Sequence, residues 1–334
     1  MTPIDNSKPV VLVTGATGFV GSRLVEALVQ RGQSVACLIR KSSNPQVLQT
    51  LPVRLIEGDL ESPAAIHGAL RGIETVYHVA GSIKAANRDS YFRVNQIGTR
   101  RLLEALAEGS PGLKRFIHVS SLAAAGPSPA DRGLTEDVKP NPISWYGESK
   151  LESEREALRY AGTFRVTILR PSAVYGPRDR ETLAIFRMVK GGCLLTPGRF
   201  TRRFSLIYVD DLITALMSAG EQDTPSGEVF FVSRPEMYTW EQVGAAIALA
   251  LGRKCRRIAF PAQLALVAGA AGDLWARLSG RPATINSQKI KELLQPSWLC
   301  DSSKASRRLG FHPQIELETG IQRTARWYQE QGWL

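Results

Sequence analysis

The phenol of Tyr146 and the amine of Lys150 stand four residues apart, downstream of a serine pair, Ser120 and Ser121. If residues 146–160 form a helix, the phenol and the amine lie one turn apart on the same face. An ammonium close to a phenol lowers the pKa of the phenol, so this tyrosine can exchange a proton with a carbinol or ketone near neutral pH. A serine hydroxyl at a strand end can hold the substrate oxygen beside it. The Tyr-x-x-x-Lys spacing also occurs on solvated helix faces, so the interpretation depends on other motifs.

A glycine-rich turn near the start of the chain follows a short β-branched run, residues 10–14. Gly15 and Gly18 allow a tight turn and a close approach to a pyrophosphate, and Gly21 allows the next helix, 22–30, to pack on the strand. The amino end of such a helix faces the phosphates. Strand, turn and helix together predict a dinucleotide-binding unit, with the spacing G-x-x-G-x-x-G in place of G-x-G-x-x-G. The alternative is an ordinary loop.

Two basic residues, Arg40 and Lys41, come directly after the second predicted strand, 34–39. A fold of this kind that prefers NAD usually offers Asp or Glu here to the ribose 2′-hydroxyl, whereas a guanidinium suits a 2′-phosphate. We therefore predict NADP(H) as the cofactor, with NAD(H) left open. The alternative is a pair of solvated charges after a strand.

Strands and helices alternate over the first half of the chain. Further strands are expected at 54–57, 75–79, 115–119 and 165–169. This alternation predicts an α/β fold with a doubly wound parallel sheet (Rossmann) over residues 8–172. We interpret residues 173–334 as a smaller, lid-like α/β substrate domain with segments that partly return to the first sheet, and expect the substrate cleft at the join.

Three polar residues of the first half invite separate interpretations. Asp59, after the third strand, is placed to accept a hydrogen bond from an adenine amine. His78 lies inside an apolar run and is expected to be a hydrogen-bonded core histidine. Asn95, near the start of a predicted helix at 94–106, is either a helix cap or a residue that holds a water.

The composition restricts the classes of partner. The 334 residues carry a formal charge of +11, and 43% of them are apolar. The one dense basic cluster, residues 253–257, has no interleaved aromatic residues, so we expect no nucleic-acid groove. Four cysteines and four histidines show neither metal-ligand nor disulfide spacing, which predicts no metal and fits a reducing compartment. Without a recognisable leader or an apolar run of 18 residues, a cytoplasmic protein is expected.

The segment 261–278 is rich in Ala and Leu, contains Trp275 and follows the basic cluster. Its apolar part is too short to span a bilayer. We expect a core helix of the second domain, and the alternative is a helix that lies on a membrane surface. A peripheral membrane contact and a homodimer are both left open.

Together these motifs resemble the extended short-chain dehydrogenases/reductases, the group that includes the NAD-dependent epimerases and dehydratases. The resemblance covers nearly the whole chain and is carried by TGATGFVG (14–21), GDL (58–60), HVAG (78–81), NQIGT (95–99), YGESK (146–150), LRPSAVYGPRD (169–179) and YVDDL (208–212). In this family the serine lies 25 residues before the tyrosine and five before a glycine. Ser121 satisfies both spacings, since Gly126 follows it, and is therefore preferred to Ser120.

The resemblance implies roles for individual residues. It makes Tyr146 the general acid/base and Ser121 the residue that orients the substrate oxygen. Lys150 would hold the nicotinamide ribose and lower the pKa of the tyrosine, and Asn95 would anchor a water. The residues implied to contact the cofactor are Gly15, Thr17, Gly18, Phe19, Val20, Gly21, Arg40, Lys41, Asp59, Leu60, Val79, Ala80, Gly81, Tyr146, Lys150, Pro171 and Val174.

Two positions distinguish the branches of the family. Nucleotide-sugar epimerases usually carry an asparagine and an arginine where this chain has Ala173 and Phe204, which removes a phosphate hydrogen bond and its charge partner. Arg202 and Arg203 are left as substitutes. The serine loop and the C-terminal part are instead similar to 3-hydroxysteroid and sterol-4-carboxylate dehydrogenases. Dihydroflavonol reductases share the arginine after the second strand, whereas the steroid branch commonly has an acidic residue there and uses NAD.

We therefore expect an NAD(P)-dependent oxidoreductase that transfers hydride reversibly between NADP(H) and a secondary alcohol or ketone. Its substrate is expected to be an apolar small molecule of steroid or isoprenoid type. The first alternative is a nucleotide-sugar 4-epimerase or dehydratase, which uses the same residues for a transient oxidation. The second alternative is a non-catalytic NADP sensor.

Overall fold

The computed structural model describes residues 10–60, 68–198 and 201–334. The first nine residues, where no leader was expected and where the predicted first domain begins, lie outside the described residues. Among the helices that the structure describes, none is long and apolar enough to cross a membrane.

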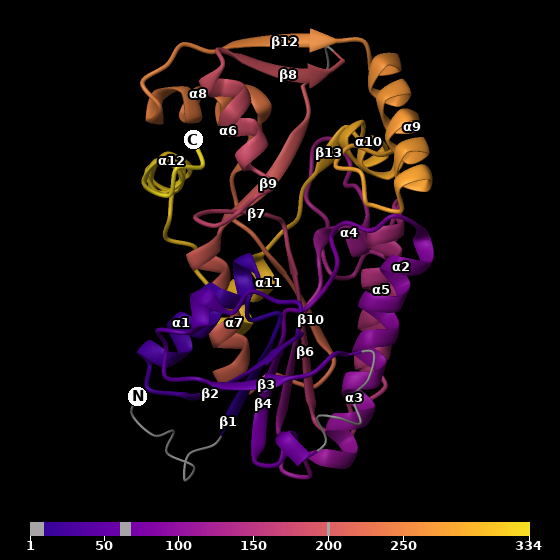
Figure 1. Cartoon of the computed structure of the whole chain (residues 1–334), viewed down its shortest axis with the longest axis vertical. Coiled ribbons are helices and arrows are strands. Elements are labelled where there is room, and N and C mark those ends of the chain that lie inside the picture. The colour runs from indigo at the N-terminus through magenta and orange to yellow at the C-terminus, as the bar shows by residue number, and fades with distance from the viewer. Residues whose placement is uncertain (1–9, 61–67, 199–200) are drawn as a thin grey trace.

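A seven-stranded parallel sheet forms the centre of the molecule, with the strand order β10-β6-β5-β4-β1-β2-β3 (Figure 1). In chain order its strands are β1 (Val10–Thr14), β2 (Ser34–Ile39), β3 (Arg54–Glu57), β4 (Ile73–His78), β5 (Arg115–Val119), β6 (Arg165–Pro171) and β10 (Glu228–Val232). The direction of the strand order reverses between β1 and β4, where folds of this type form a ligand crevice at the carboxyl ends of the strands. The predicted doubly wound sheet is confirmed.

Helices cover both faces of this sheet (Figure 1). One face holds α1 (Phe19–Gln30), α7 (Val209–Glu221) and α11 (Ser303–Leu309), and the other holds α2 (Arg88–Phe92), the π-helical turn η3 (Arg93–Ile97), α3 (Gly98–Gly109) and α5 (Trp145–Leu158). The alternation of side chains along β1 supplies both cores. Val11 and Val13 belong to the core under α1, whereas Val10 and Leu12 belong to the core under α3. A strand buried on both faces explains the continuous apolar run at residues 10–14.

The second half of the chain builds two smaller sheets. β9 (Arg203–Tyr208) pairs with β7 (Ala173–Tyr175), β11 (Met237–Thr239) and β13 (Ser297–Trp298), and β8 (Cys193–Pro197) pairs with β12 (Arg256–Phe260). Its other helices are α6 (Leu183–Lys190), α8 (Trp240–Ala250), α9 (Ala262–Ser279), α10 (Ser287–Leu293) and α12 (Leu317–Glu330). Two later segments belong to the first layer, because β10 pairs with β6 and α7 packs against α1.

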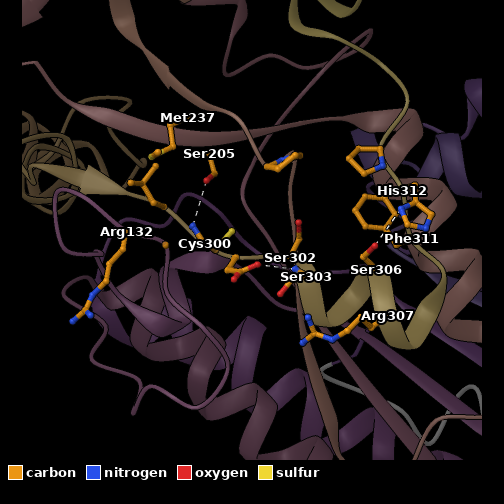
Figure 2. A pocket seen from close by; sticks show the side chains of 15 residues that line it. Arg132, Ser205, Met237, Cys300, Ser302, Ser303, Ser306, Arg307, Phe311 and His312 are labelled. Carbon is orange, nitrogen blue, oxygen red and sulfur yellow. Dashed lines mark hydrogen bonds between the residues drawn. The ribbon is translucent and has the colours of Figure 1, made fainter.

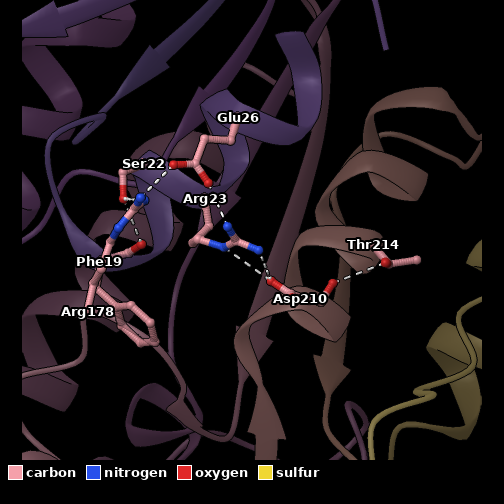
Figure 3. A network of polar contacts seen from close by, with 7 residues as sticks. All are labelled: Phe19, Ser22, Arg23, Glu26, Arg178, Asp210 and Thr214. Carbon is pink, nitrogen blue, oxygen red and sulfur yellow. Dashed lines mark hydrogen bonds and ion pairs between the residues drawn. The ribbon is translucent and has the colours of Figure 1, made fainter. Parts of the chain in front are cut away.

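Ion pairs attach the second half of the chain to α1 (Figure 3). Arg23 lies 2.7 Å from Asp210 at the start of α7 and 2.6 Å from Glu26. Arg178, in the loop after β7, lies 2.7 Å from Glu26 and donates to the hydroxyl of Ser22 at 3.1 Å. The backbone of Arg178 has a φ of 75°, which is uncommon for a residue with a side chain. These contacts hold the loop against the first turns of α1.

Helix α9 overturns one expectation. Residues 261–278 were expected to form a core helix, and the structure has a helix there, but its large apolar side chains face solvent. The buried residues of α9 are instead the small ones, Ala265, Gly269 and Ala276. Hydrophobicity alone assigned the large side chains to the interior, whereas the packing of α9 on α10 admits only small ones.

Candidate active site

The glycine turn joins β1 to α1 and touches the end of β4. Gly15 has a φ of +70°, and a Cβ on it would lie 2.7 Å from the amide nitrogen of Ala80. A Cβ on Gly21 would lie 2.1 Å from the carbonyl oxygen of Gly15, and the amide of Gly18 donates to that oxygen at 2.9 Å. The turn is therefore closed by backbone atoms that leave no room for side chains, as a close approach to a pyrophosphate requires.

The other predicted cofactor residues gather at the carboxyl ends of the parallel strands. Thr17, Phe19 and Val20 lie partly exposed in the glycine turn and the first turn of α1, and Arg40 and Lys41 are exposed after β2. Asp59 and Leu60 follow β3, and residues 79–81 follow β4. Pro171 ends β6, and Val174 lies in β7. Because all the strands of the central sheet run the same way, these segments share one edge.

This edge fits a dinucleotide. Gly18 is the N-cap of α1, and the first turn of that helix carries no acidic residue, so its amide groups present a positive end to a phosphate. The exposed guanidinium of Arg40 stands at the end of the neighbouring strand β2. When bound, NAD(P) supplies or accepts the hydride of the reaction.

Packing of α4 (Leu122–Ala125) against α5 brings Ser121 and Tyr146 together. Ser121 follows β5 and caps α4, and its hydroxyl accepts the amide of Ala123 at 3.1 Å. A Cβ on Gly147 would lie 2.3 Å from the carbonyl oxygen of Ala123, so glycine is what permits this approach of the two helices. Beside it lies the phenol of Tyr146, close enough to the hydroxyl of Ser121 for that hydroxyl to act on the pKa of the phenol. The role of Gly147 was not predicted, although its place within YGESK was visible.

Lys150 lies one turn after Tyr146 and is buried. Its ammonium donates to the carbonyl oxygen of Val119, at the end of β5, over 2.6 Å. Burial lowers the pKa of Lys150 from 10.5 to about 8, and the charge of Glu154 acts in the opposite direction. A Cβ on Gly81 would lie 3.8 Å from the Lys150 nitrogen, so the amine reaches the edge where the predicted cofactor residues gather.

The pKa of Tyr146 corrects the expectation that Lys150 lowers it. Burial raises the pKa of Tyr146 to about 12, and the charge of Glu292 and the neighbouring Tyr91 raise it further, while the hydroxyl of Ser121 acts in the opposite direction. The lowering of a phenol pKa by an adjacent ammonium can be expected from the four-residue spacing alone. The loss of water around the phenol, which raises the pKa, depends on the whole fold. Tyr146 is therefore a protonated phenol at neutral pH in this structure.

Asn95 lies inside the helical stretch that runs from Arg88 to Gly109, so the helix-cap alternative is wrong; Asn87 is the cap. Its amide nitrogen donates to the carbonyl oxygen of Ser82 at 3.0 Å and to the hydroxyl of Ser149 at 2.8 Å. Its carbonyl oxygen accepts the amide of Ser82 at 2.7 Å. Asn95 thus ties the segment after β4 to α5, and its water-holding role stays a prediction.

A buried ion pair under the site was missed by the sequence interpretation. Arg170 donates to both carboxylate oxygens of Glu154, at 2.9 and 2.6 Å, and the hydroxyl of Ser120 donates to the same carboxylate. Both charged side chains are almost inaccessible to solvent. Glu154 stands four residues after Lys150 on α5, and this spacing was the signal in the sequence that could have drawn attention to Glu154. The cluster fastens the ends of β5 and β6 to the helix that carries Tyr146.

Helix α10 also contributes to the site. The carboxylate of Glu292 accepts the hydroxyl of Ser144 at 2.6 Å, and the side chain of Gln288 accepts the amide of Trp145 at 3.1 Å. The partners in these two contacts are separated by 148 and 143 positions in the sequence, so no local pattern could have indicated the contacts. They place α10 over the amino end of α5, next to Tyr146.

A cavity of about 550 Å³ lies elsewhere, beside α11 (Figure 2). The residues that line it include none of the predicted catalytic or cofactor residues. Around it the amide of Cys300 donates to the hydroxyl of Ser205 at 3.3 Å, and Ser306 is hydrogen-bonded to His312 at 3.1 Å. Burial raises the pKa of Cys300 to about 12, so its thiol is not a nucleophile at neutral pH.

Replacing Lys150 with methionine is expected to stabilise the protein by roughly 2 kcal/mol at pH 7, while removing activity. The folded-state pKa of Lys150 lies below its ordinary value of 10.5, so folding is penalised below pH 8 and the penalty disappears as the pH rises towards 10.5. Urea unfolding of both proteins at pH 7 and pH 10 measures this. If the two proteins differ in unfolding free energy by the same amount at both pH values, the charge of Lys150 does not destabilise the fold.

A doubly wound sheet with a glycine turn before the first helix is the arrangement that binds dinucleotides at the carboxyl ends of its strands, and the fold defines that class here. The family model described as the NAD dependent epimerase/dehydratase family matches residues 11–233, so the chain belongs to this family. It is an NAD(P)-dependent enzyme of the extended short-chain dehydrogenase/reductase type.

The relatives cover almost the whole chain. A ceramide reductase from Caulobacter vibrioides is 35% identical over 331 residues, which span 98% of this chain and 97% of that protein. Sterol demethylase protein B from Methylococcus capsulatus is 30% identical, covering 96% and 98%. A solved structure of MoeE5 in complex with UDP-glucuronic acid and NAD is 26% identical, with a TM-score of 0.76 over 96% of this chain and 99% of that one. The ceramide, sterol and UDP-glucuronic acid in these names belong to different chemical classes, and all are small molecules.

Proposed function

We propose that this enzyme reduces a ketone on a large apolar lipid, with NADPH as the preferred hydride donor. The observation that carries the proposal is the placement of the Tyr146 phenol beside Ser121 by the packing of α4 on α5, one helical turn from the buried amine of Lys150. A phenol that is protonated at neutral pH can donate the proton that carbonyl reduction consumes.

Each residue has one task in this reaction. The hydroxyl of Ser121 holds the carbonyl oxygen beside the phenol, and Tyr146 donates a proton to that oxygen as the hydride reaches the carbon. Lys150, held by the Val119 carbonyl, places positive charge next to the phenolate that remains. Asn95 acts as a positioning residue, because it fixes the segment after β4 against α5.

Two positions in the second half of the chain that differ from the epimerase pattern favour an apolar molecule. Ala173 is exposed where epimerases carry an amide, and Phe204, in place of the arginine, packs on Trp240 with ring centroids 4.7 Å apart. Of the two substitute cations, Arg202 is buried and donates to the carbonyl oxygen of Pro197, while Arg203 is exposed on β9. The relatives named ceramide reductase and sterol demethylase favour the same substrate class.

Purified enzyme tests the proposal when it is offered long-chain acyl ketones and steroid ketones with NADPH, and UDP-sugars with NAD. The expected result is NADPH oxidation with an apolar ketone and no conversion of the UDP-sugars. Interconversion of UDP-sugars without net cofactor reduction would overturn it in favour of the second candidate, a nucleotide-sugar epimerase or dehydratase. That candidate draws support from the UDP-glucuronic acid complex of MoeE5. Cofactor binding without turnover of any substrate would instead indicate a sensor.

Changing Arg40 to aspartate is expected to reverse the cofactor preference, lowering kcat/KM for NADPH about a hundredfold and raising that for NADH. The physical reason is the loss of a charge-assisted bond to the 2′-phosphate and the gain of an acceptor for the ribose hydroxyl. Arg31→Asp is the control, since Arg31 is also an exposed arginine and lies at the far end of α1. An unchanged ratio of the two kcat/KM values in Arg40→Asp would refute the contact.

A further inference from the structure

Helix α9 has its side chains arranged opposite to those of an ordinary surface helix. The residues that face the protein are small and stand at positions 265, 269, 272 and 276, whereas the large apolar residues face solvent. Leu278 is 81% exposed, and Trp275 is 50% exposed. The other large residues of this outer face are Leu264, Leu266, Val267 and Leu274. Soluble proteins rarely leave so many neighbouring apolar side chains in water unless the surface has a partner.

The orientation of α9 is enforced by close packing. A Cβ on Gly272 would lie 1.9 Å from the carbonyl oxygen of Ile285, and a Cβ on Gly269 would lie 3.1 Å from the side chain of Ile290. Rotating the helix to bury its leucines would drive larger groups into the same backbone. The outer face therefore remains apolar for as long as α9 stays on α10.

Two further exposed apolar side chains lie on the strand before α9 and on the strand that pairs with it. β12 leads into the helix through Pro261 at the upper corner of the molecule (Figure 1). In the pairing of β12 with β8, Ile258 stands opposite Leu195, and both side chains are about half exposed. The outer faces of β12 and α9 together are called the apolar face below.

The segment of chain that carries this face is rich in positive charge. Between residues 253 and 291 the basic residues are Arg253, Lys254, Arg256, Arg257, Arg277, Arg281, Lys289 and Lys291, and the acidic residue is Asp273. Arg257 is paired with Glu241, and Lys289 lies 3.8 Å from Glu292. In the part of the chain that the structure describes, the other six have no acidic partner. Much of the net charge of +11 is thus carried by the segment that contains the exposed leucines and the tryptophan.

We propose that the apolar face docks on an anionic lipid bilayer. Leucines and Trp275 would enter the boundary between headgroups and acyl chains, and the surrounding cations would meet lipid phosphates. A second copy of this chain is a poorer occupant, because a symmetric contact would bring the same cations together.

Docking there would serve the proposed reaction, on which this part of the inference rests. α9 packs on α10, and α10 contacts the amino end of α5 through Ser144 and Trp145. The bilayer would then lie on the side of the molecule where Tyr146 is placed, so that an apolar ketone need not cross water.

Vesicle co-sedimentation of the full chain with saturating NADP tests the docking without any substrate. We expect binding to phosphatidylcholine vesicles that contain phosphatidylglycerol at least about tenfold tighter than to pure phosphatidylcholine, and weaker binding when salt shortens the screening length from about 10 Å to about 3 Å. The double variant Leu274→Ser with Leu278→Ser is expected to bind at least about tenfold more weakly than the wild type. Leu158→Ser, an exposed leucine at the carboxyl end of α5, is the matched control and should bind like the wild type.

Turnover of a short water-soluble ketone should be unchanged in the double variant, which shows that it folds. If the wild type does not bind anionic vesicles, or if the double variant binds them equally well, the inference is wrong. It is also wrong if sedimentation without lipid shows a dimer that the double variant dissociates. Because vesicle binding is measured without substrate, a failure to find a lipid ketone substrate would contradict the proposed function and leave this result standing.

Discussion

Replacing Tyr146 with phenylalanine is expected to lower kcat for ketone reduction at least about a thousandfold, which corresponds to roughly 4 kcal/mol of transition-state stabilisation. The change removes one oxygen, the one that lies beside Ser121, and with it the proton that the carbonyl oxygen must receive. Cofactor affinity should stay within about twofold, because the ring remains, and unfolding free energy should change by about 1 kcal/mol or less. Single-turnover NADPH oxidation and cofactor titration measure these quantities.

Tyr91→Phe is the matched control for this experiment. The ring of Tyr91 lies 6.3 Å from that of Tyr146, and its hydroxyl donates to the carbonyl oxygen of Ile83, so it is a second phenol in the same surroundings. Its loss should change kcat by less than about tenfold, since it holds no reacting proton. Retained activity in Tyr146→Phe, or an equal loss in the two variants, would contradict proton transfer by Tyr146.

Gly15→Ala is expected to weaken NADP binding at least about a hundredfold and to destabilise the fold by roughly 2–4 kcal/mol. Two effects combine at this position. The backbone φ of +70° disfavours a side chain, and the new Cβ would lie 2.7 Å from the amide nitrogen of Ala80. Relief of that contact has to move the glycine turn away from the end of β4, which alters the surface that receives the pyrophosphate. Isothermal titration and thermal unfolding report the two effects separately.

Gly32→Ala separates backbone strain from the contact. Gly32 has a φ of +72°, nearly the same as Gly15, but nothing lies within 4 Å of a Cβ built there. Its replacement should destabilise the fold by about 1–2 kcal/mol and leave NADP affinity unchanged. If the two variants lose affinity equally, or if neither does, the glycine turn does not cradle the cofactor.

Local sequence patterns determined the elements that position the chemistry. The apolar run at residues 10–14, the glycine spacing and the alternation of strands predict the doubly wound sheet, because a buried parallel strand and a tight turn each impose residue types over a few positions. The spacing of Ser121, Gly126 and Tyr146 also lies within one short stretch, and the structure places Ser121 against the tyrosine. Such patterns encode neighbours along one strand or one helical turn.

Tertiary structure alone decided what surrounds those residues. The pKa of Tyr146 rises because the fold removes water from the phenol, and the charge of Glu292 reaches it from a helix far along the chain. Asn95 is inside a helix with its amide fully engaged, and α9 buries glycine and alanine while it exposes leucine. Solvent access and packing depend on which distant elements meet, and hydrophobicity or spacing within one segment carries no information about that meeting.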